Sequence, residues 1–159
     1  MFRTIFESAE PPFLWLDLVE PTRADLERVA REYGLPATAV SDCLDPEHLP
    51  KFERFAASSF AIFRAYDERA DFTADTVQAL TRKVALFWSS TFLITIHRLD
   101  QPYLSVVITE SPGRAANVPA SNGNLLVHEL LPQLALAVVM SYEAPLEAAE
   151  ARMDEFEGT

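Results

Sequence analysis

The sequence predicts an α+β fold, an α/β/α sandwich in which a mixed parallel and antiparallel central sheet is flanked by helices. Strand-like segments lie near residues 13–18, 59–66, 77–88 and 91–97, with helical segments between and after them. The segment Phe60–Phe63 is apolar on both faces, as expected for a central strand covered on each side. A chain of 159 residues with 49% hydrophobic residues is long enough for one domain with a substantial core.

The N-terminal elements follow from local signals. Residues 1–10 are expected to contain a short edge strand, and Phe13–Leu18 alternates between two faces as a buried strand does. Thr22 is a good N-cap for a helix over residues 23–33, and Gly34 suits the end of that helix.

A second short helix begins near Pro36 and must stop near Asp45. Pro46 and Pro50 disfavour the α conformation at the residues before them, so the chain turns here before it extends again. This turn makes a fixed elbow between the helix and the central strand. The residues expected to face inward from the helix are Ala39, Val40, Cys43 and Leu44.

Three neighbouring strands are predicted in the middle of the chain, over residues 59–66, 77–88 and 91–97. The polar segment 67–76 is expected to be a loop. Ser89 and Ser90 separate the last two strands by hairpin spacing, although Ser-Ser is a weak turn signal.

The C-terminal part is expected to be mostly helical. The segment 101–110 is ambiguous between helix and strand, and 111–123 is expected to be a loop because it is rich in Pro, Gly, Ser and Asn. Asn124 is expected to cap a long helical region to about Phe156, in which Pro132 and Pro145 predict kinks or breaks.

The last stretch, 143–157, carries six acidic residues and one arginine, with apolar residues at helical spacing. We expect residues 1–142 to form the domain, and 143–159 to be the start of an acidic amphipathic stalk helix that the sequence cuts short. The longest uninterrupted apolar run, Leu134–Met140, is far below the roughly 20 residues that span a bilayer, so this chain is expected to be soluble.

The charge balance limits the partners. With 24 acidic and 13 basic residues the net charge is −11, which argues against nucleic acid and anionic lipid and suits cations. The single cysteine, Cys43, is expected to be a buried thiol in a reducing compartment. No N-terminal export signal is visible.

Enzyme chemistry is not indicated. His48, His97 and His128 have no second His or Cys at metal-ligand spacing, and there is no glycine-rich phosphate loop. For His97 we favour a polar residue that closes a strand over a catalytic role. No organic cofactor and no catalytic residue are therefore predicted.

The best chemical candidates are two acids before the elbow. Asp42 and Asp45 are three residues apart and share a helix face that is mostly not the core face. Mg²⁺ prefers oxygen ligands and keeps several waters, so one or two carboxylates suffice if a second subunit contributes the rest. The simpler alternative is a solvated helix residue for Asp42 and a turn-forming residue for Asp45.

Three groups of residues carry a resemblance to a known family. They are Trp15, Leu16, Asp17, Leu18, Pro21 and Thr22; the elbow residues Ser41 to Glu53; and Phe92, Leu93, Ile94, Thr95, Ile96 and His97. In this order they resemble the cytoplasmic N-terminal domain of CorA-like divalent-cation (Mg²⁺/Co²⁺) transporters, and the similarity covers about residues 15–155.

This resemblance implies a homopentamer whose cytoplasmic domains join two membrane helices through long stalks, with a Gly-Met-Asn signature after the first. Mg²⁺ between subunits would hold the ring closed, and its loss would let the acidic subunits repel and open the pore. The membrane helices are absent from these residues. The chain is then the soluble cation-sensing and gating domain of a parent protein at the cytoplasmic face of the inner cell membrane.

The resemblance also implies that Asp42 is a regulatory Mg²⁺ ligand at the subunit interface, with Asp45 a weaker candidate. The preceding position is often acidic in the family, but here it is Ser41, which argues against a doubly acidic site. An acid found in the family's helix matching Leu125–Tyr142 has no counterpart in the apolar run Leu134–Met140, so a weaker cation site, or none, is expected. Two alternatives remain: a Zn²⁺-handling member of the family, or a free-standing partner-binding domain of the same fold.

Overall fold

The structure, a computed structural model, describes residues 1–118 and 122–158. Its strands form one six-stranded sheet in the order β1-β2-β6-β5-β4-β3. The strands are β1 (Phe2–Ala9), β2 (Pro12–Val19), β3 (Lys51–Arg54), β4 (Ser59–Tyr66), β5 (Thr81–Trp88) and β6 (Phe92–His97). The helices are α1 (Arg23–Tyr33), α2 (Ala37–Leu44), α3 (Val77–Leu80), α4 (Pro102–Ala116), α5 (Gly123–Met140) and α6 (Glu143–Glu157).

The sheet is mixed, as predicted. β2 and β6 run parallel, and each of the other neighbouring pairs is antiparallel. The predicted edge strand within residues 1–10 is confirmed as β1, and the Ser89–Ser90 hairpin joins β5 to β6. The three central strands are neighbours, as the sequence predicts.

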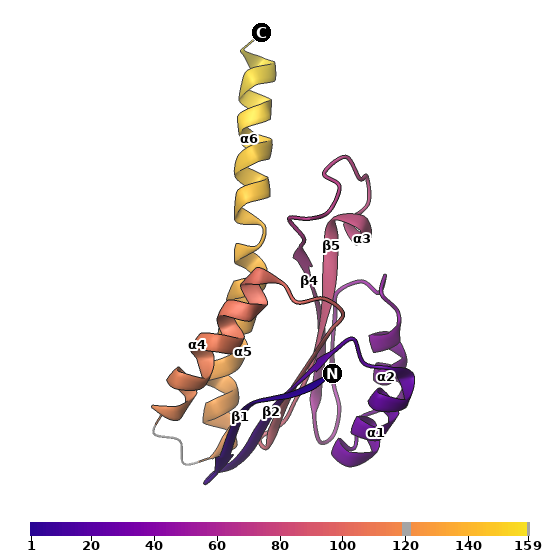
Figure 1. The fold of residues 1–159 in the computed structure, drawn as a ribbon, viewed down its shortest axis with the longest axis vertical. Coiled ribbons are helices and arrows are strands. Elements are labelled where there is room, and N and C mark those ends of the chain that lie inside the picture. The colour runs from indigo at the N-terminus through magenta and orange to yellow at the C-terminus, as the bar shows by residue number, and fades with distance from the viewer. Residues whose placement is uncertain (119–121, 159) are drawn as a thin grey trace.

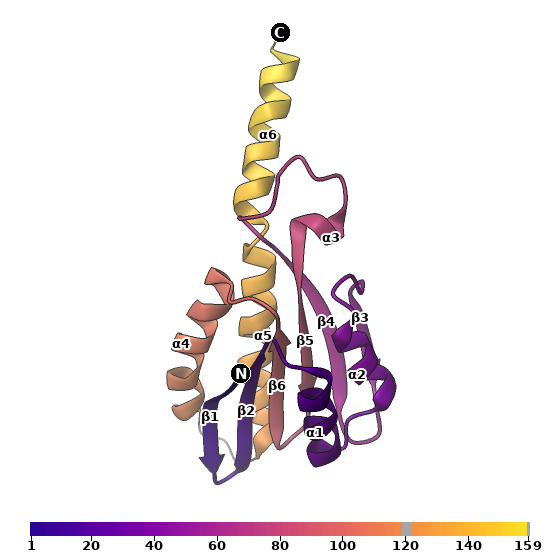
Figure 2. The same cartoon turned by 45° about the vertical axis from the view of Figure 1, so that its right-hand side comes forward.

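Helices cover both faces of the sheet, which confirms the α+β sandwich (Figure 1). On one face, α1 and α2 enclose a core in which the rings of Phe60 and Phe87 stack with centroids 4.5 Å apart. On the other face, Leu104 of α4 and Leu130 of α5 pack with Trp15 in a second core. Figure 2 shows α6 leaving this body along its long axis.

The ends of α1 are those that the sequence predicts. The Thr22 hydroxyl accepts from the Asp25 amide at 3.1 Å, and the Asp25 carboxylate accepts from the Thr22 amide, which makes a capping box. Gly34 ends the helix at φ +66°, a conformation that glycine adopts without steric cost.

Two segments in the first half differ from the prediction. The elbow contains a short edge strand, β3, which pairs with β4. The predicted strand over 77–88 begins only at Thr81, because Val77–Leu80 forms the short helix α3, which the Thr76 hydroxyl caps. Both segments are four residues long, too short for a hydrophobic period to identify them.

The predicted loop over 111–123 is wrong for residues 111–116, which continue α4. The ambiguous segment before it is the start of the same helix. Leu104, Val107, Ser111 and Ala115 are buried at helical spacing, so the packed face continues past Pro112. Residues 119–121 of the predicted loop lie outside the described residues.

The C-terminal helical region is two helices. Asn122, rather than Asn124, is the N-cap of α5, because its side chain accepts from the amides of Asn124 and Leu125. The break lies at Ser141 and Tyr142, and Pro145 falls in the first turn of α6, where no intrahelical donor is needed. Pro132 lies within α5.

By length and composition alone, one helical stretch of the described chain, Gly123–Glu157, is long and apolar enough to cross a membrane. The sequence prediction counted only uninterrupted apolar residues, so it did not register the mean hydropathy of this longer stretch. Within the stretch, Leu126, Leu130 and Leu134 of α5 pack in the core. A packed core helix meets the same criterion.

Candidate functional site

Asp42 lies in the last turn of α2, and its carboxylate faces β3, the short strand within the elbow. Its carboxylate accepts a hydrogen bond from Lys51 Nζ at 2.6 Å, and His48 Nε2 lies 3.4 Å from its other oxygen. Lys51 Nζ also lies 3.1 Å from Glu53. Asp42 is half-buried, and it already has cationic or polar neighbours within this chain.

Asp45 has a different role. Its Oδ1 accepts from the Glu47 amide at 3.0 Å, which is the bond a turn-forming aspartate makes before a proline. Asp45 is exposed and is the C-cap of α2. Within residues 1–118 and 122–158, no group of three or more His, Cys, Asp or Glu side chains is placed to hold a metal ion.

The pairing of Asp42 with Lys51 bears on cation binding. The hydrogen bond to Asp42 raises the pKa of Lys51, so the ammonium is charged at neutral pH. A divalent cation at Asp42 must therefore displace Lys51 or share the carboxylate with it. This partner was not predicted from the sequence, because Lys51 lies nine residues away across the elbow.

Two cations of the sheet hold the elbow in place. Lys83 Nζ donates to the carbonyl oxygens of Asp42 at 2.7 Å and Cys43 at 2.9 Å, and also to that of Asp45. These carbonyls end α2, where a positive charge is favourable. Arg64 Nη1 donates to the carbonyls of Pro46 and His48, each at 3.0 Å. Sequence analysis missed both residues, although a cation within an apolar strand is a visible signal.

Cys43 is unreactive. Burial raises the pKa of its thiol to about 12, so the thiolate is scarce at neutral pH. The side chain is only partly buried and packs against the first core, so the buried thiol expected from the sequence is confirmed in part.

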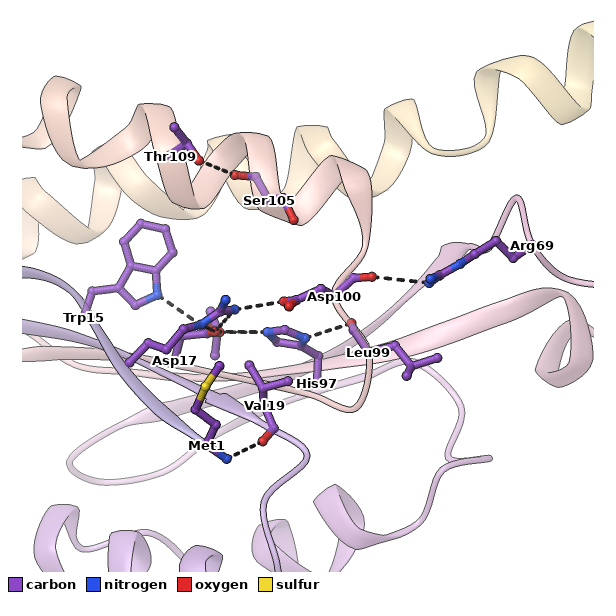
Figure 3. A network of polar contacts seen from close by, with 12 residues as sticks. Met1, Trp15, Asp17, Val19, Arg69, His97, Leu99, Asp100, Ser105 and Thr109 are labelled. Carbon is purple, nitrogen blue, oxygen red and sulfur yellow. Dashed lines mark hydrogen bonds and ion pairs between the residues drawn. The ribbon is translucent and has the colours of Figure 1, made fainter.

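A second polar cluster lies between the first strands and the end of β6 (Figure 3). Asp17, fully buried, accepts hydrogen bonds from Arg3, from Thr95 Oγ1 and from His97 Nε2, the last at 3.0 Å. Trp15 Nε1 donates to the same threonine at 3.2 Å. The cluster therefore ties β1, β2 and β6 together.

The surroundings of Asp17 favour its ionised form. Burial alone would raise the pKa of Asp17, but hydrogen bonds from His97, Thr95 and Arg3 outweigh burial and lower it below its ordinary value. His97 Nδ1 faces the Leu99 carbonyl at 2.9 Å, so both ring nitrogens meet oxygen acceptors. His97 thus closes its strand as expected, within an ionic network that the sequence did not reveal.

Comparison with known proteins gives one family match. Residues 11–159 match the family described as CorA-like Mg²⁺ transporter protein. No curated protein sequence matches the chain.

Several solved structures share the fold. The complete CorA magnesium transporter from Methanocaldococcus jannaschii is 18% identical with a TM-score of 0.58, over 92% of this chain and 43% of that one. The soluble domain of the same protein is 16% identical with a TM-score of 0.58, over 92% and 54% of the two chains. The ZntB cytoplasmic domain from Vibrio parahaemolyticus RIMD 2210633 is 14% identical with a TM-score of 0.65, over 91% and 55%. The chain thus spans about half the length of these structures.

Proposed function

This chain belongs to the CorA-like Mg²⁺ transporter family, and we propose that it is the soluble cytoplasmic domain through which such a transporter senses divalent cations. This family is one of transporters rather than enzymes. In the proposal, Asp42 supplies one carboxylate to a hydrated Mg²⁺ that a neighbouring subunit also contacts.

The proposal rests on the exposure of the Asp42 carboxylate and on the side chains that contact it. It lies at the end of α2 with about a fifth of its side chain exposed, and its partners Lys51 and His48 are themselves each about a quarter exposed. Mg²⁺ binds through few carboxylates and keeps several waters, so it needs no local ligand cluster. A second copy of the chain would complete the site, and a pentamer is the assembly we propose.

Helix α6 supports the same proposal. None of its described residues is buried, and it leaves the body with Leu146 and Met153 exposed (Figure 1). We propose that α6 belongs to a stalk that links this domain to membrane helices in the whole protein. Mg²⁺ between the acidic subunits would hold the ring closed, and its release would let them repel.

The test is cation-dependent association of the chain. Sedimentation velocity with millimolar Mg²⁺ should show larger species than in chelator, and Asp42→Asn should abolish the difference. Asp75→Asn is the matched control, because Asp75 is an exposed acid in the loop before α3 and the charge change is the same. An identical Mg²⁺ response of wild type and Asp42→Asn would contradict the role of Asp42.

A second candidate is Zn²⁺. His48 Nε2 lies 3.4 Å from Asp42 Oδ1, and a nitrogen beside a carboxylate oxygen suits Zn²⁺ better than Mg²⁺. The same experiment with micromolar Zn²⁺ separates the two. His48→Gln should weaken a response to Zn²⁺ and leave a response to Mg²⁺ unchanged.

A further inference from the structure

A cavity of about 410 Å³ lies at one end of the sheet, behind the elbow. Its lining comes from the elbow, from the neighbouring strands β4, β5 and β6, and from the segment between β6 and α4. The volume falls within the roughly 300–1,000 Å³ typical of small-molecule sites. Asp42 and the carboxylate of Asp17 are not part of this lining.

The charge of the lining is opposite to that of the chain. Four of the 13 basic residues line the cavity, but only two of the 24 acidic residues do. The lining is therefore positively charged, although the whole chain has a net charge of −11. The basic residues are Arg64, Arg82, Lys83 and Arg98, and the acidic ones are Glu20 and Glu47. Such a local reversal attracts anions.

Two of these cations face each other across neighbouring strands. Arg64 and Lys83 are direct partners in the β4–β5 ladder, where like charges are unfavourable. Arg64 is only 5% exposed, and its hydrogen bonds run to carbonyls and to the Thr81 hydroxyl, all neutral oxygens. Lys83 donates to backbone carbonyls. Burial lowers the pKa of both side chains, so an anion nearby would stabilise their charged forms.

The cavity also contains an unsatisfied donor. Gln101 is 2% exposed, and its Nε2 has no hydrogen-bond partner among the described residues. A buried amide nitrogen without an acceptor is costly, and a ligand oxygen would satisfy it. Arg98, which also lines the cavity, is exposed to solvent.

We propose that this cavity binds a small organic anion, with its carboxylate or phosphate group held by Arg98 and Gln101. Arg82 Nε is paired with Asp67 at 3.1 Å and its Nη1 donates to the carbonyls of Ala79 and Thr81, so only its Nη2 remains for the ligand. Arg64 and Lys83 already donate hydrogen bonds to carbonyl oxygens of the elbow, so they attract the anion through their positive charge. Ile96 and Leu99 supply apolar surface for the rest of the ligand. The volume exceeds what a single inorganic anion fills, which favours an organic ligand.

The binding test uses isothermal titration calorimetry in metal-free buffer at constant ionic strength. The probes are phenyl phosphate, benzoate, inorganic phosphate and benzyl alcohol. Phenyl phosphate or benzoate should bind more tightly than inorganic phosphate, and the tighter of the two identifies the preferred acid group. The neutral benzyl alcohol should not bind. Because no metal is present, the outcome is independent of the proposed cation site.

Two variants locate the site. Arg98→Glu should weaken the organic anion about tenfold or more, the value of one charge-assisted hydrogen bond. Arg23→Glu makes the same charge change on an exposed arginine of α1, and affinity should stay within about twofold. Gln101→Leu should also weaken binding, with the amide spectrum confirming that the variant is folded.

Three results would overturn the inference. One is the absence of saturable binding by wild type, and another is equal weakening by Arg98→Glu and Arg23→Glu. The third is an affinity for inorganic phosphate as high as for both organic anions, which would remove the case for an organic ligand.

Discussion

At the residue scale, Asp42 is controlled by the lysine that contacts it. Lys51 holds the carboxylate at 2.6 Å, with both side chains about a quarter exposed. An ion pair of this kind is worth up to about 1 kcal/mol. It therefore sets a modest threshold that a divalent cation must exceed before it occupies Asp42.

This pairing predicts the effect of removing the lysine. Lys51→Gln should tighten Mg²⁺ binding at Asp42 by roughly two- to fivefold, the equivalent of one partly exposed ion pair. A Mg²⁺ titration followed by sedimentation measures the change. Arg54→Gln, on the same strand but exposed, is the matched control and should leave the midpoint unchanged. Equal shifts in both variants would mean that net charge, rather than this pair, is responsible.

Asp17 is a fully buried charge that links three strands of the sheet. Asp17→Asn should cost about 3–5 kcal/mol of unfolding free energy at pH 7, because it leaves His97 and Arg3 without their buried partner. The pKa of Asp17 is lower in the folded state than its ordinary value of 3.8. The ionised Asp17 therefore stabilises the fold fully above pH 3.8, and this stabilisation is lost as the pH falls below that value. The difference between variant and wild type should therefore shrink below about pH 3.8.

Urea unfolding between pH 7 and pH 3 measures this dependence. Asp75→Asn, on the surface, should change the free energy of unfolding by less than about 0.5 kcal/mol throughout. A difference for Asp17→Asn that does not vary with pH would show that shape, rather than charge, is lost.

At the element scale, two glycines in neighbouring helices make a matched pair. A Cβ on Gly123, the first residue of α5, would lie 1.5 Å from the Ser90 carbonyl oxygen in the β5–β6 turn. A Cβ on Gly113 of α4 would meet nothing within 4 Å. The start of α5 thus packs against the hairpin through backbone alone.

The two alanine variants should change stability in opposite directions. Gly123→Ala should lower the free energy of unfolding by about 1–3 kcal/mol or more, because α5 must move away from the turn. Gly113→Ala should raise it by about 0.5–1 kcal/mol through helix propensity. Chemical denaturation measures both. Stabilisation by Gly123→Ala would contradict the close approach of α5 and the hairpin.

Elements with local signals were predictable, and those that depend on distant partners were not. Thr22 and Gly34 fix α1 through bonds within a few residues. By contrast, β3 exists because β4 offers it an edge, and α4 continues past Pro112 because Ala115 is buried in the second core. The same holds for the sites. Asp42 could be predicted from its residue type and from the family resemblance. The contact of Asp17 with His97 could not be predicted, because it joins residues 80 positions apart.

At the scale of the whole molecule, α6 contacts the body only sparsely. None of the described residues of α6 is buried, and Arg152 over the Phe72 ring, 5.3 Å from its centroid, is a contact between exposed side chains. A chain ending at Tyr142 should therefore unfold with a free energy within about 1 kcal/mol of the full chain. Denaturation of both chains measures this, and a loss of several kcal/mol would show that α6 stabilises the body.

The parallel pairing of β2 with β6 has a consequence for synthesis on the ribosome. It joins Asp17 to Thr95, 78 residues later in the sequence. Every other pair of neighbouring strands in the sheet joins two strands that are consecutive in the sequence. At a synthesis rate of roughly 5–20 residues per second, β6 is made about 4–16 s after the β1–β2 hairpin. During translation the edge of β2 that later pairs with β6 is therefore open, and its unpaired N–H and C=O groups can pair with another chain until β6 is made.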